Sequence, residues 1–452
     1  MPSVSFATDI EGNFDWWRRF CDHSEAIDVQ GFPFVKPGHI FVFGGDLFDR
    51  GPGDLRLGKE LVRMKDAQPG QVVLLMGNRD ISKMRLTSEL RHPRSDIFWR
   101  KDALDYKEFL KKFGLHDGRV ARLKWLLAET LGCGETFEYR RQELRVLGCS
   151  AGDEDVAASF EHALRPGGVY ADYLVRSQLA AVVNSTLFVH GGIDCDSLLW
   201  IPPDSLLLRA DEAGDVDGRY SKDLSSWVDE LNAFASRHVQ EWLLDEDRGE
   251  SGAAPGEALI AYQSRLATCG RSVVAAGYVL SMNFAGQCSS RESVPLVSDF
   301  RCHDCARFLV SHGVRRVVVG HRPCGAAPAI FHSNRVADGL GFEIICADTN
   351  YSSTTAPDCR GVCWVEVTIA DLGGCSQASL AGSLPQDDSN FAFMLPCCPA
   401  SAAIRDFDPF VGTQVPAISG PPWWVRAKMI NGSYYLCRSA GVNFEHCFVE
   451  LP

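Results

Sequence analysis

The sequence lacks the features that would assign it to a membrane or secreted class. No apolar run approaches the roughly 20 residues that a helix needs to cross a bilayer. The chain reaches Asp9 and Glu11 without a basic segment followed by a long apolar stretch, so we expect no signal peptide. Internal repeats and low-complexity tracts are also missing. We therefore expect a globular protein located in the cytoplasm.

An excess of positive charge is missing too. Lys and Arg total 45 against 58 for Asp and Glu, which gives a formal net charge of -13. This balance does not favour a general surface for nucleic acid or for an anionic membrane, although it allows a local basic pocket. We expect neither a nucleic acid duplex nor a membrane as a partner.

The sequence also lacks a complete zinc-binding or disulfide pattern of cysteines. Its 17 cysteines are scattered along the chain. Cys302-His303-Asp304-Cys305 has the spacing of half a zinc site, but no second pair follows at a matching distance. Cys359 with Cys363, or Cys397 with Cys398, would have to supply the other two zinc ligands, although neither pair has the usual spacing. Reduced, buried thiols are therefore the default expectation, and a structural zinc site is the alternative.

What the chain has is enough apolar material for a large core, since 46% of its 452 residues are hydrophobic. We predict a main domain over residues 1–370, with polar insertions at about 81–177 and 194–264. Residues 371–452 are expected to form a linker and a small C-terminal β unit. The sequence does not indicate an oligomeric state.

Strand-like and helix-like segments alternate in the first part of the chain. The runs 4–8, 38–43 and 71–76 have the apolar character of buried strands. Helices are predicted from Phe14 to Phe20 and from about Leu55 to Lys65. This rhythm indicates parallel α/β layering.

The two insertions have a different character. In the first, amphipathic helices are predicted over 105–113 and 119–131, together with a strand near Glu143 to Leu147. In the second, a helix is predicted from about Leu224 to Leu244. We expect the first insertion to lie over the site as a helical cap.

The core resumes outside the insertions. Strands are predicted over 185–189 and 314–319, and the segments 342–348 and 361–367 are expected to close a second sheet. The segment 423–451 has the pattern of the small C-terminal β unit.

Side chains that bind metals follow these strands, where ligands collect in open α/β sheets. Carboxylate, amide and imidazole groups gathered there can hold two divalent ions, and such a pair hydrolyses phosphate esters. The segments are Asp9-Ile10-Glu11-Gly12-Asn13, Gly44-Gly45-Asp46-Leu47-Phe48-Asp49-Arg50-Gly51, Gly77-Asn78-Arg79-Asp80, Val189-His190-Gly191-Gly192 and Gly320-His321.

The order of these motifs resembles the calcineurin-like metallophosphoesterase superfamily, nearest to its branch of phosphoprotein phosphatases and bacterial diadenosine tetraphosphatases. The resemblance spans roughly residues 4 to 350. It implies an α/β fold with a two-sheet sandwich core, helical cap insertions and a small C-terminal β appendage. It also implies a binuclear phosphohydrolase in which metal-bound water attacks phosphorus directly.

The same resemblance assigns the ligands. Asp46 would bridge two metals, Asp9 would serve the first, and Asn78, His190 and His321 would serve the second. The donor chemistry agrees, because a carboxylate has two oxygens and neutral imidazoles suit Mn, Fe or Zn. We expect two divalent ions, with Mn favoured over Fe, Zn or Mg.

Two positions depart from the family pattern. Glu11 replaces a usual His and is expected to be a metal ligand, with a water-mediated contact as the alternative. Arg79 replaces the His that protonates the leaving oxygen in protein phosphatases, and an Arg with a pKa above about 12 cannot do this. We expect Asp49 to pair with Arg79 and to orient it toward the substrate phosphate beside Arg50.

Asp49, Arg50 and Arg79 are therefore the predicted catalytic residues, and Arg50, Arg79 and Arg322 the predicted substrate contacts. Lys83 and Arg85 are read either as part of the phosphate pocket or as solvated helix charges.

Either a metal-bound water supplies the proton to the leaving oxygen, or the preferred substrate has a leaving group that needs little help. Phosphoanhydrides and aryl phosphates fit the second case better than alkyl phosphoserine. The expected substrate is a phosphorylated small molecule or nucleotide. The alternatives are a Ser/Thr-type protein phosphatase, and a catalytically weakened protein that binds phosphorylated ligands.

Overall fold

The computed structural model describes most of the chain. The described residues are 2–91, 103–193, 195–207, 216–244, 255–264, 267–275, 303–323, 325–332, 341–349, 363–371, 376–384, 390–396, 407–417, 420–440 and 443–452.

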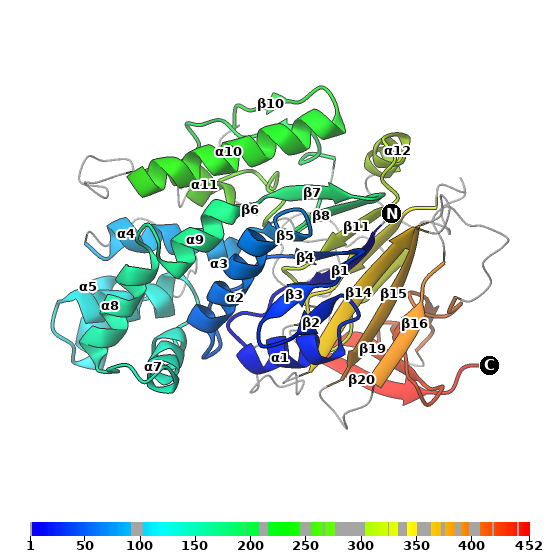
Figure 1. The fold of residues 1–452 in the computed structure, drawn as a ribbon, viewed down its shortest axis with the longest axis horizontal. Coiled ribbons are helices and arrows are strands. Elements are labelled where there is room, and N and C mark those ends of the chain that lie inside the picture. The colour runs from blue at the N-terminus through cyan, green and yellow to red at the C-terminus, as the bar shows by residue number, and fades with distance from the viewer. Residues whose placement is uncertain are drawn as a thin grey trace.

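A seven-stranded sheet forms one layer of the core (Figure 1). In spatial order it contains β16 (Asn390–Met394), β15 (Ser376–Ser383), β14 (Trp364–Asp371), β1 (Ser3–Ala7), β4 (His39–Phe43), β5 (Val72–Leu75) and β6 (Ser177–Gln178). Strands β1, β4, β5 and β6 run parallel, and β14 joins β1 in the antiparallel sense. The carboxyl ends of the parallel strands therefore meet at one edge.

A five-stranded sheet forms the second layer. Its order is β12 (Ala329–His332), β13 (Glu343–Cys346), β11 (Arg316–Val319), β8 (Thr186–Val189) and β7 (Ala180–Val183). Phe6 of β1 stacks on Phe188 of β8 with ring centroids 5.6 Å apart, so the two sheets pack face to face. The predicted two-sheet α/β core is confirmed.

Helices of the main domain begin where the sequence places them. The Asn13 side chain accepts a hydrogen bond from the Trp16 backbone N–H at 3.0 Å, which caps α1 (Phe14–His23). The buried face of α1 carries Trp16, Trp17 and Phe20. Next come the short hairpin β2 (Ile27–Val29) and β3 (Pro33–Val35), then α2 (Asp54–Ala67), α3 (Asn78–Ser82), the 3₁₀ turn η1 (Lys83–Arg85) and α4 (Leu86–Glu89).

The first insertion is helical and gathers on one side of the sheets (Figure 1). It contains α5 (Tyr106–Phe113), α6 (Arg119–Trp125), the π-helical turn η2 (Leu126–Thr130), α7 (Thr136–Val146), α8 (Asp153–Ala163) and α9 (Val169–Arg176). The predicted strand near Glu143 is wrong, because these residues complete α7. There Glu143 is fully buried and accepts hydrogen bonds from the backbone N–H groups of Leu55 and Arg56. An apolar run this short suits a buried helix face as well as a strand, and tertiary contacts decide between them.

The second insertion contains the predicted long helix, α10 (Leu224–Leu244). It also contains the short pair β9 (Trp200–Ile201) and β10 (Arg219–Tyr220), and α11 (Glu257–Tyr262). Helix α12 (His303–Ser311) then precedes β11. Among the described residues, no helix is both long enough and apolar enough to span a membrane.

The last part of the chain differs from the prediction in two respects. The segment 361–367 was expected in the second sheet, but its strand β14 pairs with β1 in the first. Strands β15 and β16 lie beyond residue 371 and extend that same sheet. The small C-terminal sheet is present and contains β17 (Gln414–Val415), β18 (Trp423–Lys428), β19 (Tyr434–Ala440) and β20 (Asn443–Val449). The division of the chain into domains stays a prediction.

Most described cysteines are free thiols, as expected. Cys195 is a correction, because it is disulfide-bonded. Within the half zinc motif, Cys305 is buried and is not part of a disulfide, while Cys302 lies outside the described residues, as do Cys359, Cys397 and Cys398. Nothing described therefore tests the zinc alternative.

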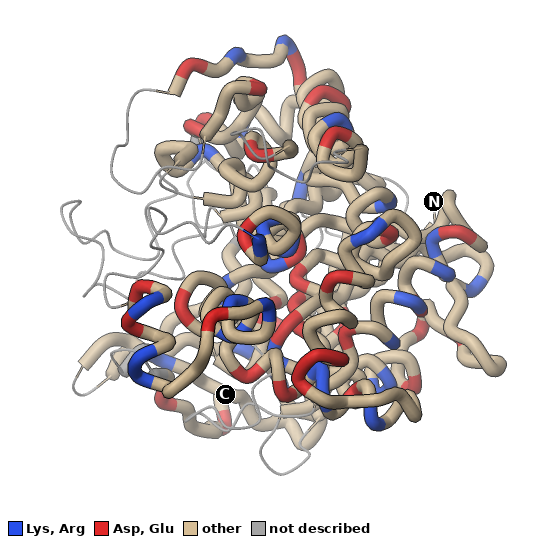
Figure 2. The backbone as a smooth tube through the Cα atoms, turned by 90° about the vertical axis from the view of Figure 1, so that its left-hand side faces the viewer, with Lys and Arg blue, Asp and Glu red and all other residues tan. Residues whose placement is uncertain are grey.

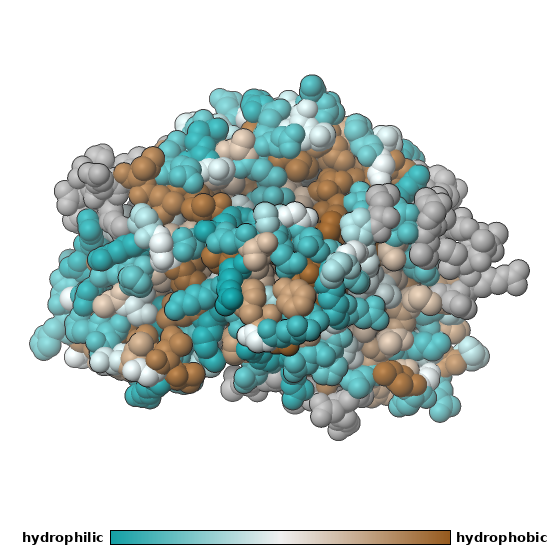
Figure 3. Space-filling model, in the orientation of Figure 1, coloured by the Kyte–Doolittle hydropathy of each residue, from teal (hydrophilic) through white to brown (hydrophobic). Residues whose placement is uncertain are grey.

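Acidic and basic positions are interspersed along the described backbone in the view of Figure 2. The face shown in Figure 3 is mainly hydrophilic, with smaller apolar patches between the polar side chains.

Candidate metal and phosphate site

All the predicted site residues lie just beyond strand ends. Asp9 follows β1, Asp46 and Asp49 follow β4, Asn78 follows β5, His190 follows β8 and His321 follows β11. Several non-glycine residues here have a positive φ, a conformation that L side chains rarely adopt and that clusters at functional sites. They are Asp9 (54°), Glu11 (48°), Asp46 (52°), Asp49 (83°), Arg50 (52°) and His321 (73°).

Three of the predicted ligands converge directly. Donor atoms of Asp46, His190 and His321 all lie within 4.8 Å of one another. The Asn78 Oδ1 atom lies 2.8 Å from His321 Nδ1 and 3.2 Å from His190 Nε2. A carboxylate, an amide oxygen and two imidazoles thus face one point, which fits a borderline divalent ion.

His190 is oriented by the backbone. Its Nδ1 lies 2.8 Å from the Gly44 carbonyl oxygen, so the Nδ1–H donates there and Nε2 faces Asp46 Oδ1 at 3.3 Å. Metal-binding histidines are commonly held in this way. Burial opposes protonation of His190, but the carboxylates of Asp46 and Asp9 outweigh it and raise the pKa to about 10. The site therefore attracts positive charge.

Asp9 lies beside this cluster. Its carboxylate accepts hydrogen bonds from the Thr8 hydroxyl at 2.5 Å and from the His321 backbone N–H at 3.1 Å. Burial and the negative charges of Asp348 and Asp46 raise its pKa well above the usual range. A divalent ion would relieve this concentration of negative charge.

Asp80 holds the loops together, and the sequence reasoning missed its role. Its carboxylate accepts hydrogen bonds from the backbone N–H groups of Asp46 at 2.9 Å, Leu47 at 2.9 Å and Gly77 at 2.8 Å. Asp80 is the third residue of α3, where an acidic side chain reaches back to the start of the helix. The acidic residue at the third position of a helix is visible in the sequence, and it could have indicated this role of Asp80.

Gly77 is required by the same close approach of loops. A Cβ atom at this position would collide with the Asp46 carboxylate and backbone. The glycine lets the strand ends of β4 and β5 lie side by side.

Arg79 contacts three carboxylates. Its Nε lies 2.6 Å from Glu11 Oε1 and 3.7 Å from Asp46 Oδ2, and its Nη1 lies 3.5 Å from Asp49 Oδ2. The expected approach to Asp49 is present, but the shorter ion pair is with Glu11. Arg50 Nη1 also reaches Glu11 Oε2 at 3.3 Å. Glu11 thus lies between two guanidinium groups.

Lys83 and Arg85 are buried and are not solvated helix charges. Lys83 is fully buried and its Nζ lies 2.6 Å from Asp49 Oδ2. Arg85 donates two hydrogen bonds of 2.8 Å to Glu89. The principal partner of Asp49 is therefore Lys83, at i+4 from Arg79 on the same helical segment.

Arg322 lies next to His321 and is partly buried. Burial, followed by the positive charges of His190 and Arg322, lowers the pKa of His321 well below its usual value. A neutral imidazole is the form that binds a metal ion.

The first insertion reaches the loop after β4. The Arg50 backbone N–H donates to Thr136 Oγ1 at 3.4 Å, and Arg140 Nη2 donates to Asp54 Oδ2 at 3.2 Å. Asp54 Oδ1 in turn accepts from the Asp49 backbone N–H at 3.1 Å. Helix α7 thus supports the segment that carries Asp46, Asp49 and Arg50.

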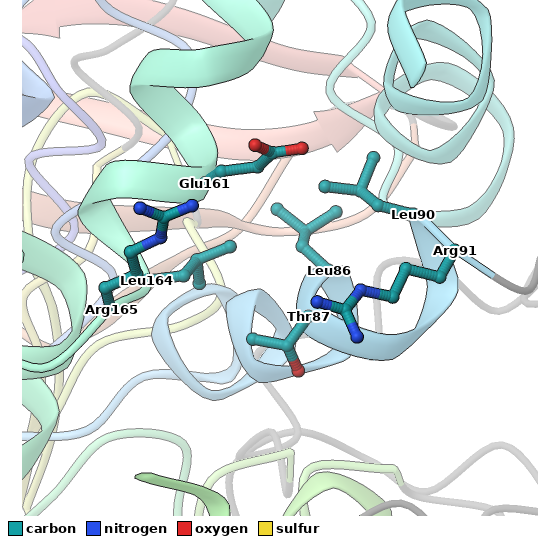
Figure 4. A pocket seen from close by; sticks show the side chains of 7 residues that line it. All are labelled: Leu86, Thr87, Leu90, Arg91, Glu161, Leu164 and Arg165. Carbon is teal, nitrogen blue, oxygen red and sulfur yellow. The ribbon is translucent and has the colours of Figure 1, made fainter. Parts of the chain in front are cut away.

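A separate cavity of about 320 Å³ lies between α4 and α8 (Figure 4). Leu86, Leu90 and Leu164 form its apolar wall, and Arg91 and Arg165 approach it from opposite sides. None of its lining residues belongs to the cluster at the strand ends. This cavity is therefore distinct from the candidate metal site.

Comparison with known proteins gives a family. Residues 4–325 match the family model described as calcineurin-like phosphoesterase. No curated protein matches the chain in sequence.

Two solved phosphatases are similar to the chain at low identity. The first is the cold-active protein-tyrosine phosphatase of a psychrophilic Shewanella species, with 14% identity over 87% of this chain and 80% of that chain and a TM-score of 0.39. The second is a protein serine/threonine phosphatase from Saccharomyces cerevisiae, with 13% identity over 87% of this chain and 79% of that chain and a TM-score of 0.34.

Proposed function

Because this chain belongs to the calcineurin-like phosphoesterase family, we propose that its strand-end cluster is the active site of a metal-dependent phosphohydrolase for phosphate monoesters or phosphoanhydrides. The family makes the protein a phosphoric ester hydrolase. The observation that carries the proposal is the convergence of Asp46, His190 and His321 within 4.8 Å. Asp46 follows β4 of the seven-stranded sheet, whereas His190 and His321 follow β8 and β11 of the five-stranded sheet.

We propose that this cluster holds two divalent ions and that Mn²⁺ is the preferred ion. Asp46, Asn78, His190 and His321 have the donors for one position, and Asp9, Asp46 and Glu11 have the donors for the other. When bound, such ions lower the pKa of a coordinated water and neutralise the charge of a phosphate.

The residues of the chain itself bind and orient the substrate. Arg50 is the more accessible cation, with 36% of its side chain exposed against 15% for Arg79. Both guanidinium groups can donate paired hydrogen bonds to phosphate oxygens and stabilise charge in the transition state. Arg322, beside His321, is the third proposed substrate contact. Asp49, which is held by Lys83, lies 3.5 Å from Arg79 Nη1 and orients this guanidinium.

The substrate follows from the missing proton donor. Arg79 keeps its proton, since the charges of Glu11, Asp49 and Asp46 outweigh burial and raise its pKa further. A leaving group that needs no protonation is therefore favoured, as in aryl phosphates and nucleotide phosphoanhydrides. We propose a phosphorylated small molecule or nucleotide as the substrate.

Hydrolysis of three substrate classes by the Mn-loaded protein tests this proposal. Turnover of para-nitrophenyl phosphate and dinucleoside polyphosphates is expected to exceed turnover of phosphoserine peptides. Preference for the phosphopeptides would instead support the alternative of a Ser/Thr-type protein phosphatase. If the metal-loaded protein hydrolyses none of the three substrates, the proposal that it is an active phosphohydrolase is refuted.

One observation favours a second candidate, a weakened relative that binds phosphorylated ligands. Glu11, an assigned metal ligand, is engaged by two arginines. If that engagement persists with metal present, the protein binds phosphate without turnover. Equilibrium binding of inorganic phosphate to a catalytically silent, metal-loaded protein would identify this case.

A further inference from the structure

The two residues that depart from the family pattern face each other. Arg79 Nε and Glu11 Oε1 are 2.6 Å apart, and 15% and 6% of the respective side chains are exposed. An ion pair with this distance and little access to water is a strong, charge-assisted hydrogen bond. The two replacements are therefore coupled, because each neutralises the charge that the other introduces.

The same guanidinium lies against Asp46. Arg79 Nε is 3.7 Å from Asp46 Oδ2, while Asp46 Oδ1 is 3.3 Å from His190 Nε2. One oxygen of Asp46 thus faces the imidazole of His190, and the other faces the positive charge of Arg79. Arg79 thus places its charge beside both Glu11 and Asp46, two of the carboxylates that we assign to the second metal position.

Arg79 also has another acceptor within reach. Its Nη1 is 3.5 Å from Asp49 Oδ2, and Asp49 Oδ1 is a buried atom with no hydrogen-bond partner among the described residues. Asp49 thus retains acceptor capacity although Lys83 already binds it at 2.6 Å. A guanidinium that leaves Glu11 therefore has Asp49 as an alternative partner.

We infer that Arg79 is an internal competitor for a metal ion, and that its exchange between Glu11 and Asp49 controls one of the two metal positions. Paired with Glu11, the guanidinium closes the position formed by Asp9, Glu11 and Asp46. Paired with Asp49, it opens that position. The inference rests on the proposed function, since it concerns the same metal site.

Unequal metal affinities follow. An ion between Asp46, Asn78, His190 and His321 binds without moving Arg79. An ion at the other position has to displace the guanidinium from Glu11. Because hydrogen bonds between charged groups contribute about 1.5 to 3 kcal/mol, the second ion is expected to bind about ten- to a hundredfold more weakly than the first.

Titration of the metal-free full chain with MnCl₂ tests this directly. Calorimetry measures the two affinities, and electron paramagnetic resonance distinguishes an isolated Mn²⁺ ion from a spin-coupled pair. In the unsubstituted protein, one equivalent is expected to give an isolated-ion signal, and coupling appears only in excess metal. Arg79→Gln is expected to tighten the second equivalent by about tenfold or more.

Arg50→Gln is the matched control. Arg50 contacts the same carboxylate, but at 3.3 Å and with 36% of its side chain exposed. Solvent screening makes such contacts weak, so the second affinity is expected to change by less than about threefold. Glu11→Gln is expected to abolish the second equivalent and to keep the first.

Arg79→Lys is a second test in case the Gln variant misfolds, because it keeps a positive charge among the buried carboxylates. A lysine lacks the planar fork, so a smaller tightening in the same direction is expected. Two equivalents of equal affinity in the unsubstituted protein, or an unchanged second affinity in both Arg79 variants, would overturn the inference. Loss of phosphatase turnover with these metal affinities intact would count against the proposed function alone.

Discussion

Lys83 Nζ lies 2.6 Å from Asp49 Oδ2, and both side chains are almost completely buried. A lysine inside a protein core has no solvent to stabilise its charge, so the Asp49 carboxylate is its essential counterion. Asp49 is in turn within 3.5 Å of Arg79. The pair thus connects the hydrophobic core to the candidate site.

Lys83→Met is expected to destabilise the protein by about 3 to 5 kcal/mol, since it leaves the Asp49 charge buried without its main partner. Urea unfolding measures the loss. The double variant Lys83→Met with Asp49→Asn should recover much of it, because no uncompensated charge remains. Equal instability of the single and double variants would contradict the assignment of this ion pair.

Asp46→Asn is expected to reduce kcat/KM by at least about a hundredfold, because direct ligands matter more than outer partners, whose loss already costs about 10- to 100-fold. An amide offers one oxygen where the carboxylate offers two. Steady-state kinetics on para-nitrophenyl phosphate in saturating Mn²⁺ provides the measurement, and an unchanged melting temperature excludes unfolding. Near-normal turnover would remove Asp46 from the metal site.

Arg79→His is expected to restore a proton donor near the leaving oxygen. Since general acid catalysis contributes about 10²- to 10⁴-fold, the ratio of kcat/KM for alkyl over aryl phosphates should rise by at least about tenfold. Arg79→Gln is the control, because it cannot donate a proton of suitable acidity. The same ratio in both variants would show that the site does not limit alkyl esters through proton transfer.

Asp54 predicts a pH dependence of stability. Burial, partly offset by Arg140, raises the pKa of Asp54 from 3.8 to about 7. Between these values the folded protein holds a proton that the unfolded chain has lost. This contribution is therefore complete below about pH 4 and is lost as the pH rises through 7, for a total of up to about 4 kcal/mol.

Asp54→Asn should remove this slope. The Asn side chain does not titrate, so the difference in unfolding free energy between the two proteins should change between pH 4 and pH 7 and then level off. Urea unfolding at several pH values measures it. A difference that is constant across this range would mean that Asp54 titrates normally in the folded protein.

Several features of this protein were readable from local sequence. Apolar runs that end in polar motifs identified β1, β4, β5, β8 and β11, because a buried strand and the ligand that follows it are adjacent in the chain. The same adjacency located Asp46, His190 and His321 at one edge of the core. Capping chemistry placed the start of α1 at Asn13.

Pairings between distant segments were decided only in three dimensions. The strand β14 joins β1 in the first sheet, and the helix α7 takes the place of a predicted strand, because burial against α2 outweighs a weak local pattern. The hydrophobic periodicity of these segments predicts neither the pairing of β14 with β1 nor the packing of α7 on α2.

The sequence by itself determined which side chains lie at the candidate site and which strand each of them follows. Both depend only on which residues are adjacent in the chain. Tertiary structure alone decided that Arg79 pairs first with Glu11 and that Lys83 takes Asp49. These partners are chosen by distance and by exclusion of water, and buried charges bind whichever opposite charge the fold brings within reach.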